Sequence, residues 1–393
     1  MDLFVARQPI LDAERRVIGY ELLLRAPGGA AAQESLTAAA VADALLSVGI
    51  DTLVGDRLAF VDVDDPDTVE DFAGLLPPGR VVLEIDASWP ADAARIEKYR
   101  GLRRSGYALA ADRFPRHGAA AGLLGEFDFV KVEAHGGRWG TPERRASSRA
   151  GGPTLIALDV NSVDELAAAT AAQFSMFQGR CFGRAASRTA HALPAEQWNC
   201  LNSLAVVSQP DVTVLELERV VKADAGLSLR LLRTANSAGS TARSEVRSIR
   251  EALILLGLKV VRHWLALWFV RAIGKSAHSE LLATATIRAH CCDALASNIG
   301  DDGGFIVGLC SPLDEILQQP MAAVLEHMPL AADAQAALMG EQNHYRHLLE
   351  AVMAYERGDW ERCREKSESA GADVAVLPHA YAEALRWHAE AHV

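Results

Sequence analysis

The chain has 393 residues, 50% of them hydrophobic, and its 39 basic and 51 acidic residues give a net charge of -12. This length suggests about two or three domains, with ample apolar content for a core in each. The acidic balance argues against a nonspecific nucleic-acid surface, but it is compatible with a local basic pocket for one small anion.

No stretch of the sequence has the hydropathy pattern of a signal peptide or of a membrane span. Asp2, Arg7 and Asp12 interrupt the apolar core that a secretory signal peptide would need. The most apolar run, Trp264 to Val270, ends at Arg271 and falls far below the ~20 residues of a membrane span. The six cysteines show neither metal-ligand spacing nor a secreted disulfide pattern. We therefore expect a cytoplasmic protein.

Two apolar stretches near the N-terminus, 4–10 and 17–25, predict strands joined by a short polar connection. A parallel crossover needs a dozen or more residues, so we expect an antiparallel hairpin. The second strand carries Glu21 and Arg25 inside an apolar run. Because a buried ionisable group needs a partner, these side chains should face a ligand, a metal or each other. A structural ion pair at a strand end is the plainer alternative.

Up to about residue 190, short apolar runs alternate with helical patterns, which predicts an α/β fold with a parallel sheet. Each run leads directly to a charged or amide side chain, and these residues are Asp62, Glu84, Asp112, Lys131, Asp159 and Gln178. Such residues at strand C-termini are typical of a barrel with its site at that end. A solvated loop after each strand would also explain them.

Glu21-Leu22-Leu23-Leu24-Arg25 carries the E-x-L-x-R pattern, and Arg7-Gln8-Pro9-Ile10 precedes it. Together they resemble EAL domains, the cyclic-di-GMP phosphodiesterases, and the resemblance continues in order across residues 1–190. It implies a modified TIM-like barrel with an antiparallel first hairpin. It also implies two divalent ions that activate a water for attack on a phosphodiester.

The resemblance assigns roles to individual residues. It implies nucleotide binding by Arg25 and Gln178 and places Lys131 near the attacking water. Its metal ligands, which are oxygen donors suited to one Mg²⁺ or Mn²⁺, would be Glu21, Asp62, Glu84 and Asp112.

Departures from the family pattern predict loss of activity. Arg113 replaces the second aspartate of a metal-binding pair, and Leu158 and Asn161 replace two glutamates. A guanidinium about 4 Å from a divalent ion is repelled by several kcal/mol at an effective dielectric of ~20. We therefore predict one metal site at most and no competent phosphodiesterase, with Lys131 and Asp112 as vestigial catalytic residues.

Arg113 admits two further interpretations. With Arg25 and Lys131 it would form a cationic pocket that binds phosphate without a metal. Alternatively it forms an internal salt bridge to Glu84 or Asp112. The residues themselves leave both open.

After residue 190 the strand pattern ends and helical periodicity takes over, with Ser248 predicted to cap a helix over 249–256 that closes at Gly257. The segments Leu231 to Ser237 and Ser248 to Ala252 resemble HDOD domains, helical relatives of the HD phosphohydrolases. The resemblance implies two domains, a degenerate EAL barrel over 1–190 and a helical HDOD bundle over 191–393.

HD enzymes bind metal through an adjacent His-Asp pair, and no such dipeptide occurs in the sequence. His344 and His347 lie on one predicted helical face, but no acid or cysteine near them in the sequence completes a metal site. We therefore expect a protein-binding module. A module that closes over the barrel mouth and transmits ligand occupancy is the alternative.

These observations predict a noncatalytic cyclic-di-GMP signalling protein. Its barrel would act as nucleotide sensor or scaffold, and its helical domain would bind a protein partner. A weakly active phosphodiesterase using Lys131 and Asp112 is one alternative, and a purely structural regulator without a nucleotide ligand is another. Oligomeric state is not predicted.

Overall fold

The computed structural model describes residues 4–25, 41–43, 45, 48–63, 69–86, 92–112, 124–134, 152–179, 193–209, 211–238, 246, 248–274, 279–328 and 330–390. Two compact units make up the chain. Unit 1 contains Met1–Ser187, Glu350–Glu368 and Asp373–Val393, and unit 2 contains Arg188–Leu349 and Ser369–Ala372.

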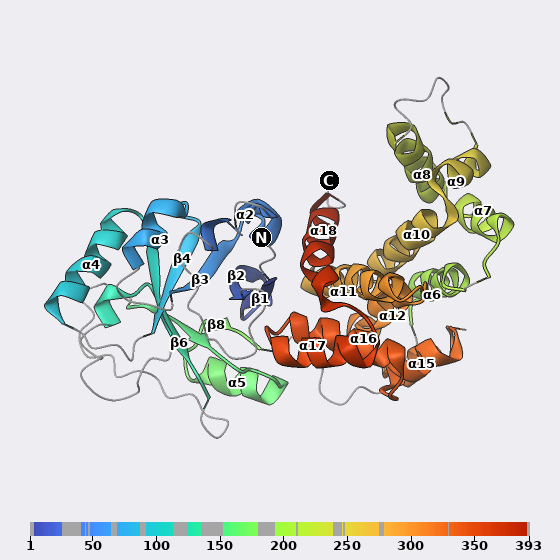
Figure 1. Cartoon of the computed structure of the whole chain (residues 1–393). Coiled ribbons are helices and arrows are strands. Elements are labelled where there is room, and N and C mark those ends of the chain that lie inside the picture. Colours follow the sequence, from blue (N-terminus) through green and yellow to red (C-terminus); the bar gives the residue numbers. More distant parts are fainter. Residues whose placement is uncertain are drawn as a thin grey trace. The chain divides into compact units, whose positions relative to one another are not determined.

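Unit 1 is built on a closed barrel with the strand order β1-β2-β3-β4-β5-β6-β7-β8 (Figure 1). The strands are β1 Phe4–Asp12, β2 Val17–Arg25, β3 Leu58–Val63, β4 Val81–Asp86, β5 Ala108–Asp112, β6 Phe129–Val132, β7 Thr154–Ala157 and β8 Met176–Phe177. β1 pairs antiparallel with β2 and β8, and the remaining neighbours pair parallel. The predicted barrel with an antiparallel first hairpin is confirmed.

Local sequence explains the turns and helix starts of the barrel. The hairpin turn is closed by Asp12, whose side chain accepts a hydrogen bond from the Arg16 backbone N–H at 2.8 Å. Asp92 and Ser162 cap the helices that follow them by accepting from backbone N–H groups. The helices between the strands are α2 Ile50–Val54, α3 Val69–Leu75, α4 Ala93–Arg104 and α5 Val163–Ala171.

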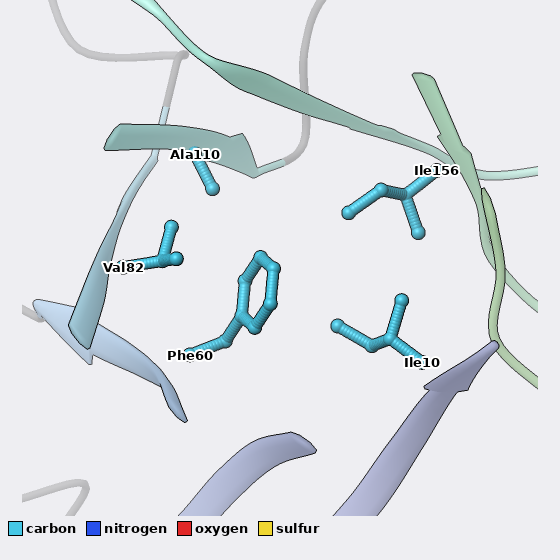
Figure 2. Packing of buried hydrophobic residues seen from close by; sticks show 5 residues of the cluster. All are labelled: Ile10, Phe60, Val82, Ala110 and Ile156. Atoms are coloured by element: carbon cyan, nitrogen blue, oxygen red, sulfur yellow. The ribbon is translucent and has the colours of Figure 1, made fainter. Parts of the chain in front are cut away.

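The barrel interior is filled by apolar side chains (Figure 2). Phe60 lies in the middle of a fully buried cluster, and the others are Ile10, Val82, Ala110 and Ile156. The Phe60 ring also meets Phe129 edge-on, with centroids 5.2 Å apart. This plug closes the barrel below the carboxyl ends of the strands, so any site must lie above it.

Unit 2 is helical, as predicted. Its helices are α6 Ala195–Val207, α7 Val214–Lys222, α8 Ala225–Ala238, α9 Ile249–Leu256, α10 Leu258–Ile273, α11 Ser279–Asn298, α12 Gly304–Cys310, α13 Leu313–Leu317, α14 Met321–Leu325 and α15 Ala332–Met339. Ser248 forms a capping box with Glu251 at the start of α9, and Gly257 ends that helix with φ 83°. The predicted helix over 249–256 is confirmed.

The last helices are α16 His344–Tyr355, α17 Trp360–Ser369 and α18 Leu377–Glu390, with a 3₁₀ turn η2 at Val374–Val376. The residues from Glu350 to Glu368 and from Asp373 onward group with the barrel in unit 1. They do so because Tyr355 and Tyr381 contact the first strand. The domain boundary at 190/191 stays a prediction. The two C-terminal segments, although they follow that boundary in the sequence, pack with the barrel.

The described helices include no single one that is long and apolar enough to cross a membrane. α9 and α10 together meet the length and composition criterion, but they are bent by 111° at Gly257. Much of α10 is buried inside unit 2, and its buried residues include Leu265 and Val270.

Two glycines let α11 and α12 pack closely. A Cβ on Gly308 would collide with the backbone oxygen of Arg288, and a Cβ on Gly304 would collide with that of Cys292. The two glycines are four residues apart and lie on one face of α12. Small residues at this spacing allow helix backbones to approach closely.

We expect Gly308→Ala to lower the free energy of unfolding of unit 2 by about 1–3 kcal/mol, because an added methyl group overpacks the helix contact. Urea denaturation followed by circular dichroism measures this. Gly101→Ala is the control, since a Cβ there meets nothing within 4 Å and should be neutral or stabilising by about 0.5–1 kcal/mol. Equal effects of the two substitutions would contradict the close-packing explanation.

Candidate polar site in the barrel

The ammonium group of Lys131 lies at the centre of a polar layer above the apolar plug. Its Nζ is 2.9 Å from Oε2 of Glu21 and 2.5 Å from Oε1 of Glu84. Lys131 and Glu84 are each only 1% exposed. Lys131 and Glu84 are therefore shielded from water, whereas the Glu21 side chain is 21% exposed.

Gln178 and Gln8 extend this network. The Gln178 side-chain amide donates to Oε2 of Glu21 at 2.5 Å and to Oε1 of Gln8 at 3.0 Å. We refer to Glu21, Glu84, Lys131 and Gln178 as the polar layer. Its members come from β2, β4, β6 and the residue after β8, and such contribution by alternate strands is how side chains stack inside barrels of this type.

Charge pairing shifts the pKa values of this layer. Burial, together with the neighbouring Glu21 and Asp112 carboxylates, raises the pKa of Glu84 well above its ordinary value, against the opposing pull of Lys131. Burial also works to raise the pKa of Glu21, but the Lys131 ammonium and the Gln178 hydrogen bond outweigh it, so the value is lowered. Burial works to lower the pKa of Lys131, and the two glutamates reverse this and raise it.

The other predicted acids end the neighbouring strands. Asp62 pairs in register with Glu84, is exposed at the end of β3, and so shares its face of the sheet. Asp112 is the last residue of β5, half-buried, and pairs in register with Asp86. Asp112 is near enough to Glu84 to contribute to its raised pKa.

A divalent ion between Glu21 and Glu84 does not fit the described residues. Their oxygens converge on the Lys131 ammonium, which would repel a cation there. Across the described part of the chain, no group of three or more His, Cys, Asp or Glu side chains could hold a metal. The single-ion site over Glu21, Asp62, Glu84 and Asp112 therefore stays a prediction.

The predicted cations are only partly placed. Arg25 ends β2 opposite Phe4 and is half-buried. Lys131 is the partner of Glu21, in place of the ion pair with Arg25 that was one expectation. Arg113 lies outside the described residues. Glu84 does not depend on it for a salt bridge, because Lys131 supplies one.

The late positions that depart from the family pattern have local structural roles. Leu158 packs against the apolar plug inside the barrel. Asp159 is exposed, with φ 55°, and Asn161 donates from its backbone N–H to Glu165 at 2.7 Å near the start of α5. Leu158 therefore places an apolar side chain inside the barrel, and this side chain can neither bind a metal ion nor transfer a proton.

Two residues of the site were missed from the sequence. Gln8 is the register partner of Glu21 in the hairpin, and Asp86 lies two residues after Glu84 on β4. Antiparallel register and the two-residue period of a strand would have pointed to both.

A surface cavity of about 610 Å³ lies at the opposite end of β5. Among its lining residues are three arginines, and each has an acidic partner: Glu126 for Arg100, Asp128 for Arg103 and Glu97 for Arg104. Because these charges are neutralised, the cavity is a weaker candidate than the polar layer.

The helical unit holds two half-buried histidines in place of a His-Asp pair. The His263 ring on α10 stacks on Phe305 of α12, with centroids 3.6 Å apart and planes 2° from parallel. His290 of α11 meets the same ring edge-on at 5.8 Å. Burial lowers the pKa of His263 to about 3, with Lys259 and His290 adding to the shift, and burial lowers the pKa of His290 to about 4.

His344 has an acidic neighbour that its own segment of the sequence does not contain. Asp301, distant in sequence, lies beside His344, with Oδ2 3.3 Å from Nε2. Tyr345 donates to the same carboxylate at 2.7 Å. Neither His344 nor His347 belongs to a group of metal-ligating side chains within the described residues. Asp301 instead ties the loop before α12 to α16.

Comparison with known proteins identifies the helical region. The HDOD domain model matches residues 193–344. Residues 193–344 are an HDOD domain. The closed barrel and this match agree with the predicted order of a barrel followed by an HDOD domain. The matched region ends at His344, the first residue of α16, before the segments that group with the barrel.

Two known proteins match this chain over nearly their whole length. The protein YuxH of Bacillus subtilis is 26% identical over 98% of this chain and 98% of its own length. The protein of Vibrio cholerae named cyclic di-GMP phosphodiesterase CdgJ is 28% identical over 98% of this chain and 92% of its own length.

Solved structures match at low TM-scores. BlrP1 of Klebsiella pneumoniae, solved with manganese and cyclic di-GMP, has a TM-score of 0.34 and 21% identity, and the match covers 46% of this chain and 55% of that one. YkuI of Bacillus subtilis, solved with cyclic di-GMP and calcium, has a TM-score of 0.35 and 17% identity over 65% of this chain and 71% of its own. This chain therefore spans about half the length of the Klebsiella protein.

We expect Lys131→Met to lower the stability of the barrel by about 3–5 kcal/mol, because two buried carboxylates lose their counter-ion. The loss should shrink below neutral pH, since the raised pKa of Glu84 lets that group take up a proton and shed its charge. Urea denaturation at several pH values measures both effects.

Two controls accompany this substitution. The double variant Lys131→Met with Glu84→Gln should recover part of the lost stability, because only one carboxylate is then left without its counter-ion. Lys98→Met removes an ammonium group on α4 that lies 3.9 Å from Glu70 and should cost less than about 1 kcal/mol. A Lys131→Met protein as stable as the wild type at neutral pH would refute the ion-pair account.

We expect the HDOD domain to lose stability as the pH falls below 6.5. His263 and His290 stay neutral when folded but take up protons when unfolded, so the unfolded state binds more protons between pH 6.5 and about 4. Each histidine should contribute about 2 kcal/mol of this loss by pH 5. Urea midpoints at pH 7 and pH 5 measure the effect, and His263→Gln should remove about half of it, because His290 remains.

Proposed function

We propose that this chain is a noncatalytic signalling protein of the cyclic-di-GMP pathway. Its barrel binds the dinucleotide or serves as a scaffold, and its HDOD domain binds a protein partner. The name of the full-length Vibrio cholerae relative supports the pathway. The cytoplasmic location expected from the sequence is part of the same proposal.

One observation carries the noncatalytic part of the proposal. Hydrolysis by two metal ions requires carboxylates that are free to hold them. Here the carboxylates of Glu21 and Glu84 are bound to the Lys131 ammonium at 2.9 and 2.5 Å. Leu158 adds an apolar side chain to the same interior.

The charge balance of the polar layer supports anion binding. Its two carboxylates and one ammonium sum to a single negative charge, and because the pKa of Glu84 is raised, this charge falls more readily as the pH is lowered. A smaller negative charge repels phosphate less. We propose Arg25, Arg113 and the Gln178 amide as the groups that bind the nucleotide, since guanidinium groups suit phosphate oxygens.

The enzymatic alternative also has support. Asp62 and Glu84 are register partners, as are Asp86 and Asp112, so four acids line neighbouring strand ends. If Lys131 moved aside, Glu21, Asp62, Glu84 and Asp112 would hold one Mg²⁺ or Mn²⁺, and Lys131 and Asp112 would serve a slow phosphodiesterase.

The HDOD surface supports a protein partner. Large apolar side chains are exposed on consecutive helices, with Leu229 on α8 at 52%, Ile254 on α9 at 70% and Val260 on α10 at 42%. A contiguous exposed apolar surface is a feature of interaction sites, and we propose these three side chains as members of one.

Isothermal titration calorimetry with cyclic di-GMP, in EDTA and in Mg²⁺, tests the proposal. We expect similar affinities in both buffers, and we expect Arg25→Ala to weaken binding about tenfold or more through loss of a charged hydrogen bond. Arg100→Ala removes an arginine at the other end of the barrel unit and should bind like the wild type.

Product analysis decides between sensor and enzyme. The noncatalytic proposal expects no linear dinucleotide after prolonged incubation with Mg²⁺ or Mn²⁺. Turnover that disappears in Glu21→Ala would establish the phosphodiesterase instead. If calorimetry detects no binding heat at high micromolar cyclic di-GMP, the barrel is a scaffold and not a nucleotide sensor.

A further inference from the structure

The first strand of the barrel has an edge that its neighbour only partly covers. β1 pairs with β2 from Phe4 to Leu11, but its described pairing with β8 involves only Leu11 and Asp12. Every second residue of β1 therefore directs its backbone N–H and C=O away from β2, toward this edge. Unpaired backbone groups at a sheet edge need other partners when they are buried.

Two tyrosine hydroxyls from the C-terminal helices supply these partners. Tyr355, the last residue of α16, accepts from the Val5 N–H at 3.3 Å and donates to the Val5 carbonyl at 3.1 Å. Tyr381 of α18 accepts from the Arg7 N–H at 3.3 Å. The next residue with this orientation is Pro9, which has no N–H to satisfy. The hydroxyls thus complete the edge where β8 does not reach.

Aromatic packing fixes the two tyrosines in place. Tyr355 is 1% exposed and Tyr381 is 3% exposed. Their ring centroids are 5.1 Å apart, and Trp360 meets Tyr355 edge-on at the same distance. Phe4, at the start of β1, contacts both Tyr355 and Trp360. Rings held this tightly leave each hydroxyl little freedom to leave its backbone partner.

The completed edge lies next to the polar layer. Gln8 follows Arg7 directly on β1, and its Oε1 accepts from the Gln178 amide, which also donates to Glu21. The Arg7 side chain adds a second anchor, since its guanidinium donates to the Leu53 carbonyl and lies 4.1 Å over the Tyr20 ring. A shift of β1 at Arg7 would therefore displace Gln8 from Gln178.

We propose that Tyr355 and Tyr381 are positioning residues of the barrel site, which hold Gln8 against Gln178 by completing the open edge of β1. The C-terminal segments of unit 1 thereby become part of the ligand-binding apparatus. The effect on nucleotide affinity rests on the proposed function, whereas the effect on Gln8 and Gln178 does not.

The test compares Tyr381→Phe and Tyr355→Phe with Tyr107→Phe in the full chain. Each substitution removes one hydroxyl, and Tyr107 is the matched control because its hydroxyl donates to the Leu76 carbonyl, away from β1. Hydrogen exchange measured by NMR reports the Val5 and Arg7 amides and the Gln178 side-chain amide. We expect exchange to accelerate about tenfold or more at all three in the β1-edge variants and to stay unchanged in Tyr107→Phe.

Affinity for cyclic di-GMP gives the second measurement. We expect Tyr381→Phe to weaken binding about fivefold, and to weaken it no further in a Gln8→Ala background, because both changes act through one contact. The positioning role would be overturned if the affinity losses of Tyr381→Phe and Gln8→Ala added up. It would also be overturned if the Arg7 amide exchanged faster while the exchange rate of the Gln178 side-chain amide did not change. If the wild-type protein binds no dinucleotide, the nucleotide-sensor part of the proposed function fails, and the Gln178 exchange rate alone decides this inference.

Discussion

The ion pairs of Lys131 with Glu21 and Glu84 are the interactions on which the barrel site depends. A buried ammonium group and two buried carboxylates are each costly alone, and they are tolerated because each satisfies the others. The arrangement also decides the chemistry, because a carboxylate bound to an ammonium group is a poor ligand for a metal ion. The Gln178 amide extends the network by donating to the same Glu21 oxygen and to Gln8. The apolar plug beneath it keeps water from reaching the pairs from below.

Much of the barrel could be predicted from the sequence because its signals are local. The hairpin followed from a connection too short for a crossover, and the strand ends followed from apolar runs that stop at polar residues. The pairing inside the site could not be predicted in the same way. Lys131 reaches Glu21 and Glu84 across a closed barrel, and only the curvature of the whole sheet brings β2, β4 and β6 side chains to one level.

Contacts within the helical unit could not be predicted for the same reason, because they join segments that are distant in the sequence. Asp301 and His344 are 43 residues apart, and the periodicity of neither segment predicts that they are in contact. Gly304 and Gly308 gave a visible four-residue spacing, but the sequence does not say which helix comes close to them. The HDOD domain was recognised from short motifs, whereas the contacts of Tyr355 and Tyr381 with the first strand lie beyond any motif.

The contact between Arg7 and Tyr381 joins residues separated by 374 positions. On the ribosome, the first strand is therefore synthesised long before the helix that completes its edge. Until α18 emerges, that strand presents free backbone groups of the kind that pair with other chains. Prematurely terminated copies of the protein would keep this exposed edge for their whole lifetime. A chain that contains α18 can therefore cover this edge of the first strand, whereas a fragment that lacks α18 cannot.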